Sequence, residues 1–150
     1  MPHSYTSNLM HCTFSTKERY PWIDSDLERQ LWPYIGGIAR KNRMKALTIG
    51  GMFNHLHALL SLPSTMSLAK AVQLIKGGSS KWIHDSMAKY RKFEWQEGYG
   101  AFSVSASQVK KTIAYINDQK QHHRKRTFKE EFIELLDKHQ IEYDPRYVFR

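Results

Sequence analysis

The stretch "GGMFNHLHALLSLP", residues 50–63, places two histidines one residue apart inside an otherwise apolar segment. Side chains alternate across a β-strand, so His55 and His57 are predicted to lie on one face of such a strand. The neighbouring positions predicted to face the core are apolar: Leu56, Ala58 and Leu60. Two imidazoles on one face can bind one metal ion, although strands also carry such pairs without any metal. A metal site needs at least one further ligand from elsewhere in the chain.

The composition is that of a compact and strongly basic domain. The chain has 150 residues, of which 41% are hydrophobic, enough for an ordinary core. Lys and Arg number 23 against 14 Asp and Glu, and the net charge of +9 favours polyanions such as nucleic acid or an acidic membrane. The single cysteine, Cys12, excludes an internal disulfide, and no apolar run is long enough to span a bilayer. A reducing, cytoplasmic setting is therefore expected.

Strand and helix signals alternate along the chain, which predicts one α+β domain over residues 1–150. Residues 8–15 are predicted to form a first strand. Residues 44–62 are predicted to form two strands that turn at Gly50–Gly51, with the histidines on the second. Residues 93–104 are predicted to form a strand interrupted by a glycine-rich turn.

Capping residues mark the starts of three predicted helices: Asp24, Ser67 and Thr127. Glu130 follows Thr127 at the spacing of a capping box, which strengthens the last of these assignments. A further helix is predicted over residues 105–123, with Ser105 as its cap. The segment after residue 140 is predicted to be irregular and to pack its aromatic side chains.

The predicted helix over residues 105–123 carries a second chemical candidate. Its apolar stripe consists of Val109, Ile113 and Ile116. Tyr115 and Gln119 are four residues apart and fall together on the flank of this stripe. They would present a phenol and an amide oxygen to the same place. The alternative is that Tyr115 is an aromatic at the core boundary and that Gln119 is solvated.

Together these residues suggest phosphoryl chemistry. Two imidazoles and the amide oxygen of Gln119 leave open positions on Mg²⁺ or Mn²⁺ where phosphate oxygens can bind. A tyrosine beside the ion can attack phosphorus and form a covalent phosphotyrosine. Because an ordinary tyrosine has a pKa of about 10, Tyr115 needs help from the cation or from Lys111. The covalent intermediate conserves the energy of the broken phosphodiester for rejoining.

The motif "FNHLHALL", followed some sixty residues later by "YINDQ", resembles the single-tyrosine HUH transposases of small bacterial insertion sequences and their relatives associated with repetitive extragenic palindromes. The flanking stretches "HCTFSTKERYPWI", "FEWQEGYGAFSVSASQ" and "QKQHHRKRTFKEEFIELLDKHQIEYDPRY" resemble the same family, so the likeness covers nearly the whole chain. Phe53 departs from the pattern, since relatives often have proline there. It lies outside the reacting groups.

The resemblance implies a role for each site residue. His55, His57 and Gln119 match the metal ligands, and Tyr115 matches the nucleophile. The family cleaves single-stranded DNA at ends marked by hairpins, leaves a 5′-phosphotyrosine and a free 3′-hydroxyl, and rejoins the strands. The implied protein is a nucleoid-associated enzyme without a membrane partner.

The resemblance also implies an architecture. The family fold is a ferredoxin-like (RRM-like) sandwich of an antiparallel sheet with helices, and two subunits join their sheets into a homodimer. In many members the tyrosine helix of one subunit completes the histidine pair of the other. Gly98 and Gly100 would then provide the hinge for an exchanged helix. Whether Tyr115 acts within its own subunit stays open.

Clusters of basic residues are candidates for DNA contacts. The candidates are Lys17, Arg19, Lys110, Lys111, Arg124, Lys125 and Arg126. Aromatic residues that could stack on unpaired bases are Trp22, Tyr90, Trp95 and Tyr99. The alternative for each basic run is an ordinary solvated helix face.

Three alternatives stay open. His122 or His123 could join His55 and His57 in a zinc site, although the adjacent "RKR" favours a DNA-facing or solvated stretch. The chain could be a binding protein for single-stranded DNA or RNA that keeps the fold but performs no chemistry. It could also be a metal-dependent hydrolase that uses the histidines without Tyr115.

Overall fold

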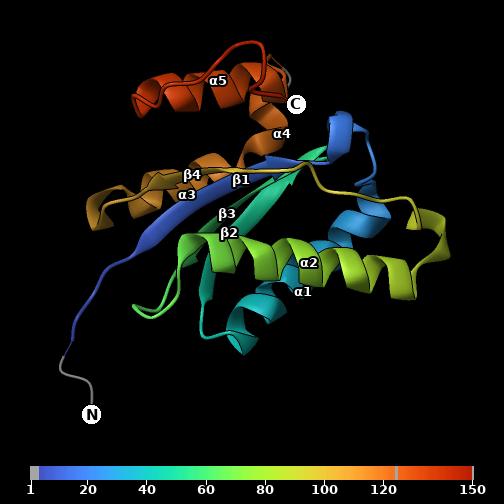
Figure 1. Ribbon diagram of the computed structural model, residues 1–150, viewed down its shortest axis with the longest axis horizontal. Coiled ribbons are helices and arrows are strands. Elements are labelled where there is room, and N and C mark those ends of the chain that lie inside the picture. The colour runs from blue at the N-terminus through green and yellow to red at the C-terminus, as the bar shows by residue number, and fades with distance from the viewer. Residues whose placement is uncertain (1–3, 124, 150) are drawn as a thin grey trace.

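The sheet has four antiparallel strands in the order β2-β3-β1-β4, as a computed structural model of residues 4–123 and 125–149 shows (Figure 1). The strands are β1 (Leu9–Ser15), β2 (Lys45–Met52), β3 (His55–Ser61) and β4 (Gly100–Ser103). With a helix after β1 and another after β3, this is the βαββαβ arrangement of the ferredoxin-like sandwich. The predicted fold class is confirmed.

Two long helices cover one face of the sheet and enclose the main core (Figure 1). They are α1 (Ser25–Lys41) and α2 (Leu68–Ser86). The predicted caps are present, since the side chains of Asp24 and Ser67 accept hydrogen bonds from the backbone N–H groups of Leu27 and Lys70. On the strand side, the core takes up Leu56, Ala58 and Leu60 of β3, as their alternation predicts.

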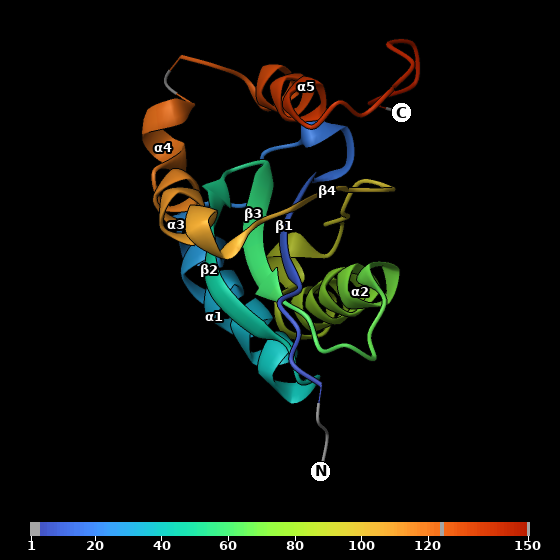
Figure 2. The same ribbon diagram turned by 90° about the vertical axis from the view of Figure 1, so that its left-hand side faces the viewer.

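The C-terminal helices lie on the opposite face of the sheet (Figure 2). They are α3 (Val109–Asn117), α4 (Gln119–His122) and α5 (Phe128–Lys138), and short 3₁₀ turns occupy η1 (Lys17–Arg19), η2 (Ala88–Tyr90) and η3 (Ala106–Gln108). The predicted capping box of Thr127 and Glu130 begins α5. A second apolar cluster around Phe132 takes up Tyr143, Val148 and Phe149 from the irregular terminal segment. Over the described residues, no helix combines the length and apolar character needed to cross a membrane.

The glycine pair Gly50–Gly51 does not form the turn that the sequence suggests. Both glycines lie inside β2, where they pair with His57 and Leu56, and the chain reverses at Phe53 and Asn54. The physical reason is close packing, because a Cβ on Gly50 would lie 2.4 Å from the carbonyl oxygen of Ile116 in α3. The absence of a side chain at Gly50 therefore allows α3 to pack closely against β2.

The predicted helix over residues 105–123 is divided into three pieces. Ser105 caps none of them with its side chain, which instead lies 3.1 Å from the Ser107 hydroxyl. The backbone leaves helical geometry at Asp118, between α3 and α4. The predicted strand over residues 93–104 is also shorter, since only β4 and an isolated bridge between Thr16 and Trp95 form there.

A matched pair of glycine substitutions tests how β2 positions α3. We expect Gly50→Ala to lower the free energy of unfolding by about 2 kcal/mol, because the added methyl forces α3 away from the strand. Gly77→Ala, in the middle of α2 with no neighbouring atom within 4 Å, should raise it by about 0.5–1 kcal/mol. Urea denaturation measures both. A Gly50→Ala protein as stable as the unmodified chain would contradict the packing described.

Candidate active site

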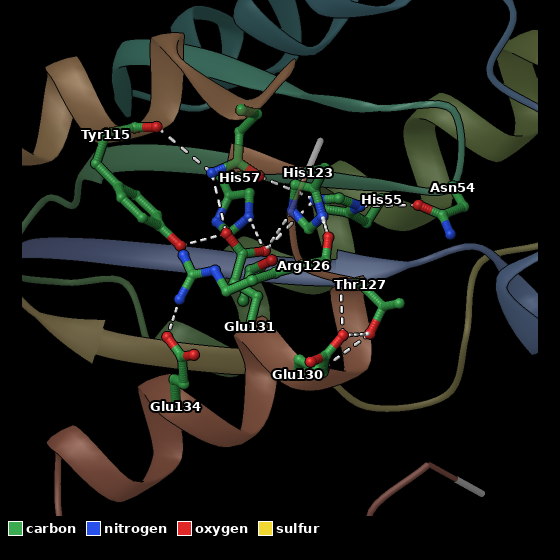
Figure 3. Close-up of polar contacts among 12 residues, drawn as sticks. Asn54, His55, His57, Tyr115, His123, Arg126, Thr127, Glu130, Glu131 and Glu134 are labelled. Atoms are coloured by element: carbon green, nitrogen blue, oxygen red, sulfur yellow. Dashed lines mark hydrogen bonds and ion pairs between the residues drawn. The ribbon is translucent and has the colours of Figure 1, made fainter. Parts of the chain in front are cut away.

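Strand β3 presents both histidines to the face of the sheet that the C-terminal helices cover. The side chains of His55 and His57 are 0% exposed, and their ring centroids lie 5.2 Å apart (Figure 3). Leu56 between them points into the core on the other face. The alternation read from the sequence is therefore confirmed, and the histidine face is enclosed rather than open.

The outer ring nitrogen of each histidine is held by a neighbour. His55 Nδ1 donates to Asn54 Oδ1 at 2.9 Å, and His57 Nδ1 lies 2.7 Å from His11 Nε2. Burial, and then the nearby His57, lower the pKa of His55 to about 3, so its ring is neutral at pH 7. His55 Nε2 faces the centre of the site, 3.0 Å from Gln119 Oε1. Metal-binding histidines in proteins are commonly oriented by such outer contacts.

A buried carboxylate, Glu131 of α5, occupies the centre of the site (Figure 3). Its Oε1 accepts hydrogen bonds from His57 Nε2 and His123 Nε2, both at 3.0 Å. Its Oε2 accepts from Gln119 Nε2 at 3.1 Å and from the Tyr115 hydroxyl. Burial alone would raise the pKa of Glu131, but the bonds from His123 and His57 hold that pKa well below its usual range. One carboxylate thus joins side chains from β3, α3, α4 and the segment before α5.

Sequence reasoning missed Glu131. Its position in α5 was the one indication in the sequence. Phe128 precedes it by one helical turn and Phe132 follows it directly, so Glu131 lies on the apolar side of the helix. A carboxylate among the buried positions of an amphipathic helix requires a polar partner. Its partner His57 lies 74 residues away in the sequence, and no helical or strand periodicity connects the two.

Tyr115 and Gln119 reach the histidine pair within the same chain. The Tyr115 ring lies 5.8 Å from the His57 ring and perpendicular to it, and Gln119 Oε1 lies 3.0 Å from His55 Nε2. Gln119 is buried, so the alternative that it is a solvated side chain is wrong. Burial and the Glu131 carboxylate raise the pKa of Tyr115 above its ordinary value. This hydroxyl donates to Glu131 and also interacts with Gln119, and Lys111 is not among the partners described for it.

His55, His57 and Glu131 form a compact cluster of candidate ligands for a divalent metal ion. Their candidate ligand atoms all lie within 4.8 Å of one another, and Glu131 Oε1 is 3.5 Å from His55 Nε2 and 3.0 Å from His57 Nε2. Two ligand atoms about 2.1 Å from one ion, at angles of about 90–110°, lie roughly 3.0–3.4 Å apart. Imidazole nitrogens with a carboxylate oxygen suit Mn²⁺ and related ions.

His123 corrects one expectation from the sequence. Of the two expectations for this residue, a zinc ligand or a DNA-facing or solvated side chain, the second is wrong, because the ring of His123 lies 4.5 Å from that of His55 and its Nε2 contacts Glu131. His122 packs instead against the outer side of Tyr115, with ring centroids 4.7 Å apart.

The predicted DNA contacts remain predictions, and the structure places them in separate regions. Lys17 pairs with Glu94, Arg19 lies over the Phe149 ring, and Arg126 pairs with Glu134. Lys110 and Lys111 are exposed on α3, Lys125 is exposed before α5, and Arg124 lies outside the described residues.

Two of the aromatic residues predicted to stack on bases are buried. Tyr90 and Trp95 belong to the main core, because the Trp95 ring packs edge-on against Phe14 and Phe93. Trp22 is partly buried against this core, and Tyr99 is partly exposed. Of these four residues, Tyr99 is therefore the most exposed candidate for stacking.

The proposed hinge glycines differ in their surroundings. Gly98 has a φ of +78° and open space around it, as a flexible connection requires. Gly100 lies in β4, where an added Cβ would meet the Phe132 ring at 2.8 Å. Gly100 thus serves packing between β4 and α5.

Comparisons with known proteins show the family and the fold of this chain. Residues 4–119 match the family model described as "Transposase IS200 like", a range that includes both histidines of β3, Tyr115 and Gln119. The match ends before His123 and Glu131. No curated protein matches the sequence.

Two solved structures share the fold. One is a protein of Deinococcus radiodurans R1 described as a transposase, with a TM-score of 0.65 and 18% identity over 78% of this chain and 97% of that one. The other is a REP-associated tyrosine transposase bound to a REP hairpin, with a TM-score of 0.56 and 14% identity over 77% of this chain and 68% of that one. The family match covers most of the sequence, and this chain therefore belongs to the IS200-like transposases.

Proposed function

We propose that this transposase cleaves and rejoins single-stranded DNA through a covalent bond between Tyr115 and a 5′-phosphate. The observation that carries the proposal is the Glu131 carboxylate, which accepts the Tyr115 hydrogen bond and contacts His57 at the same time. The nucleophile and the metal-binding group therefore meet at one point. Both belong to the same chain.

The proposed cleavage exchanges one phosphoester bond for another. The Tyr115 oxygen attacks phosphorus, the bond from phosphorus to the 3′-oxygen breaks, and the DNA keeps a free 3′-hydroxyl. The Glu131 carboxylate orients the phenol, and the proton that the phenol loses is balanced by the proton that the leaving 3′-oxygen takes up from solvent. In the reverse step, a 3′-hydroxyl from another strand attacks the phosphotyrosine and releases Tyr115.

The cofactor that fits these residues is Mg²⁺ or Mn²⁺. His55 and His57 would hold it through their inner nitrogens together with an oxygen of Glu131, and Gln119 Oε1, beside His55 Nε2, is a further candidate ligand. When bound, the ion would neutralise charge on the attacked phosphate. Asn54 and His11 hold the two imidazoles in position from outside.

A DNA hairpin is the proposed recognition element. The net charge of +9 suits a nucleic-acid partner. The REP-associated transposase that shares this fold is bound to a REP hairpin, which supports the same kind of ligand here. A homodimer that joins two sheets stays a prediction, and the proposed chemistry does not depend on it.

Replacement of Tyr115 tests the covalent step. The protein is incubated with Mn²⁺ and single-stranded hairpin DNA from the flanks of its gene, and the adduct is detected on a denaturing gel. Tyr115→Phe should reduce the adduct to background, because the attacking oxygen is lost. Tyr34→Phe, on the opposite side of the sheet in α1, should leave it unchanged. Adduct formed by Tyr115→Phe at the level of the unmodified protein would refute the mechanism.

Titration calorimetry with Mn²⁺ tests the role of Glu131 at the metal. Glu131→Gln keeps the side-chain shape but loses the negative oxygen, and we expect affinity for Mn²⁺ to fall at least tenfold. Glu130→Gln is the matched control, since Glu130 is exposed and only caps α5. His57→Ala should abolish binding. Equal Mn²⁺ affinity of Glu131→Gln and Glu130→Gln would exclude Glu131 as a ligand.

A further inference from the structure

A cleft of about 640 Å³ opens beside Tyr115, between α3, α5 and the segment that follows β4. Its lining includes Lys111 and Tyr115 of α3, Lys138 and His139 at the end of α5, and His11 of β1. Ligand clefts in proteins commonly have volumes of about 300–1,000 Å³. The volume of the cleft therefore lies within the range of ligand-binding clefts.

The charge of this cleft suits a polyanion. Lys111 and Lys138 are exposed, and within residues 4–123 and 125–149 no acidic side chain lines the cleft. A larger hollow of about 800 Å³ beside η1 also carries basic residues, but Glu18, Glu94 and Glu97 line it as well. The cleft beside Tyr115 is therefore the better match for phosphates.

One wall of the cleft is an aromatic platform. His139 stacks on Phe102 with ring centroids 4.5 Å apart and planes inclined by 28°. His139 Nδ1 donates to the Leu135 carbonyl oxygen at 2.8 Å, which fixes the ring. Phe102 is buried, whereas His139 is partly exposed toward the cleft. A rigid ring of this kind can stack on an unpaired base.

The inner end of the cleft leads to the reacting groups. His11 lies there, with its ring 5.9 Å from the Tyr115 ring and its Nε2 2.7 Å from His57 Nδ1. His11 itself is buried. A strand lying in the cleft would therefore pass the Tyr115 side chain directly.

We propose that this cleft binds the unpaired nucleotides next to the phosphate that Tyr115 attacks. Lys111 and Lys138 contact the phosphates, and His139 stacks on a base. The volume suits a few unpaired nucleotides rather than a duplex. This assignment rests on the proposed function, because it takes Tyr115 to be the group that meets DNA.

The test measures binding separately from chemistry, in the Tyr115→Phe protein. Fluorescence anisotropy follows a labelled oligothymidylate at increasing salt. Lys111→Gln with Lys138→Gln should weaken binding roughly tenfold and lower the slope of log affinity against log salt by about 1.4, or about 0.7 for each phosphate contact. The control pair is Lys70→Gln with Lys92→Gln, two exposed lysines on α2 and after η2, which should change neither quantity.

A third variant separates stacking from charge. His139→Ala should weaken binding roughly fivefold without changing the salt slope, because it removes a ring and leaves both lysines. Equal affinity and salt slope for the cleft pair and the control pair would overturn the assignment. Lack of oligothymidylate binding by the Tyr115→Phe protein would overturn it as well.

Failure of the cleft assignment and failure of the phosphotyrosine mechanism give different results in these experiments. If the unmodified protein forms no covalent adduct but the cleft lysines still set oligothymidylate affinity, the cleft binds DNA and the phosphotyrosine mechanism is wrong. If the adduct forms and the cleft lysines have no effect on affinity, the mechanism stands and the cleft assignment is overturned.

Discussion

The buried Glu131 carboxylate is the constraint on which the candidate site depends. A carboxylate taken out of water is strongly unfavourable unless hydrogen-bond donors surround it. Here the donors come from Tyr115, Gln119, His57 and His123, which belong to four separate parts of the chain. Throughout the described part of the chain, no buried side-chain polar atom lacks a partner. These hydrogen bonds tie helix α5 to the sheet in the position that brings Tyr115 and the histidines together.

The fold was largely predictable because its signals are local. Two-residue alternation around His55 and His57 identifies β3 and its core face, and the capping residues locate the starts of α1, α2 and α5. Gly50 misled the prediction because glycine serves both turns and close packing, and only the position of Ile116 decides between them. Sequence patterns therefore place elements better than they place contacts between elements.

The site was predictable only in part. The resemblance pairs His55 and His57 with Tyr115 and Gln119, and the structure brings these four together. Glu131 could not be found this way, because the resemblance, although it extends over this part of the chain, assigns roles only to His55, His57, Tyr115 and Gln119. Glu131 reaches the site through the packing of α5 over the sheet, and such a tertiary contact leaves no periodic pattern in the sequence. The proposed metal site accordingly depends on α5 as much as on β3.

Anomalous diffraction from crystals soaked in Mn²⁺ tests whether Glu131 and the two histidines hold one metal ion, because it locates the ion independently of activity. We expect one strong peak at about 2.0–2.3 Å from the inner nitrogens of His55 and His57 and from a Glu131 oxygen. A peak at the two histidines with Glu131 out of coordination range, or a peak elsewhere on the chain, would contradict it.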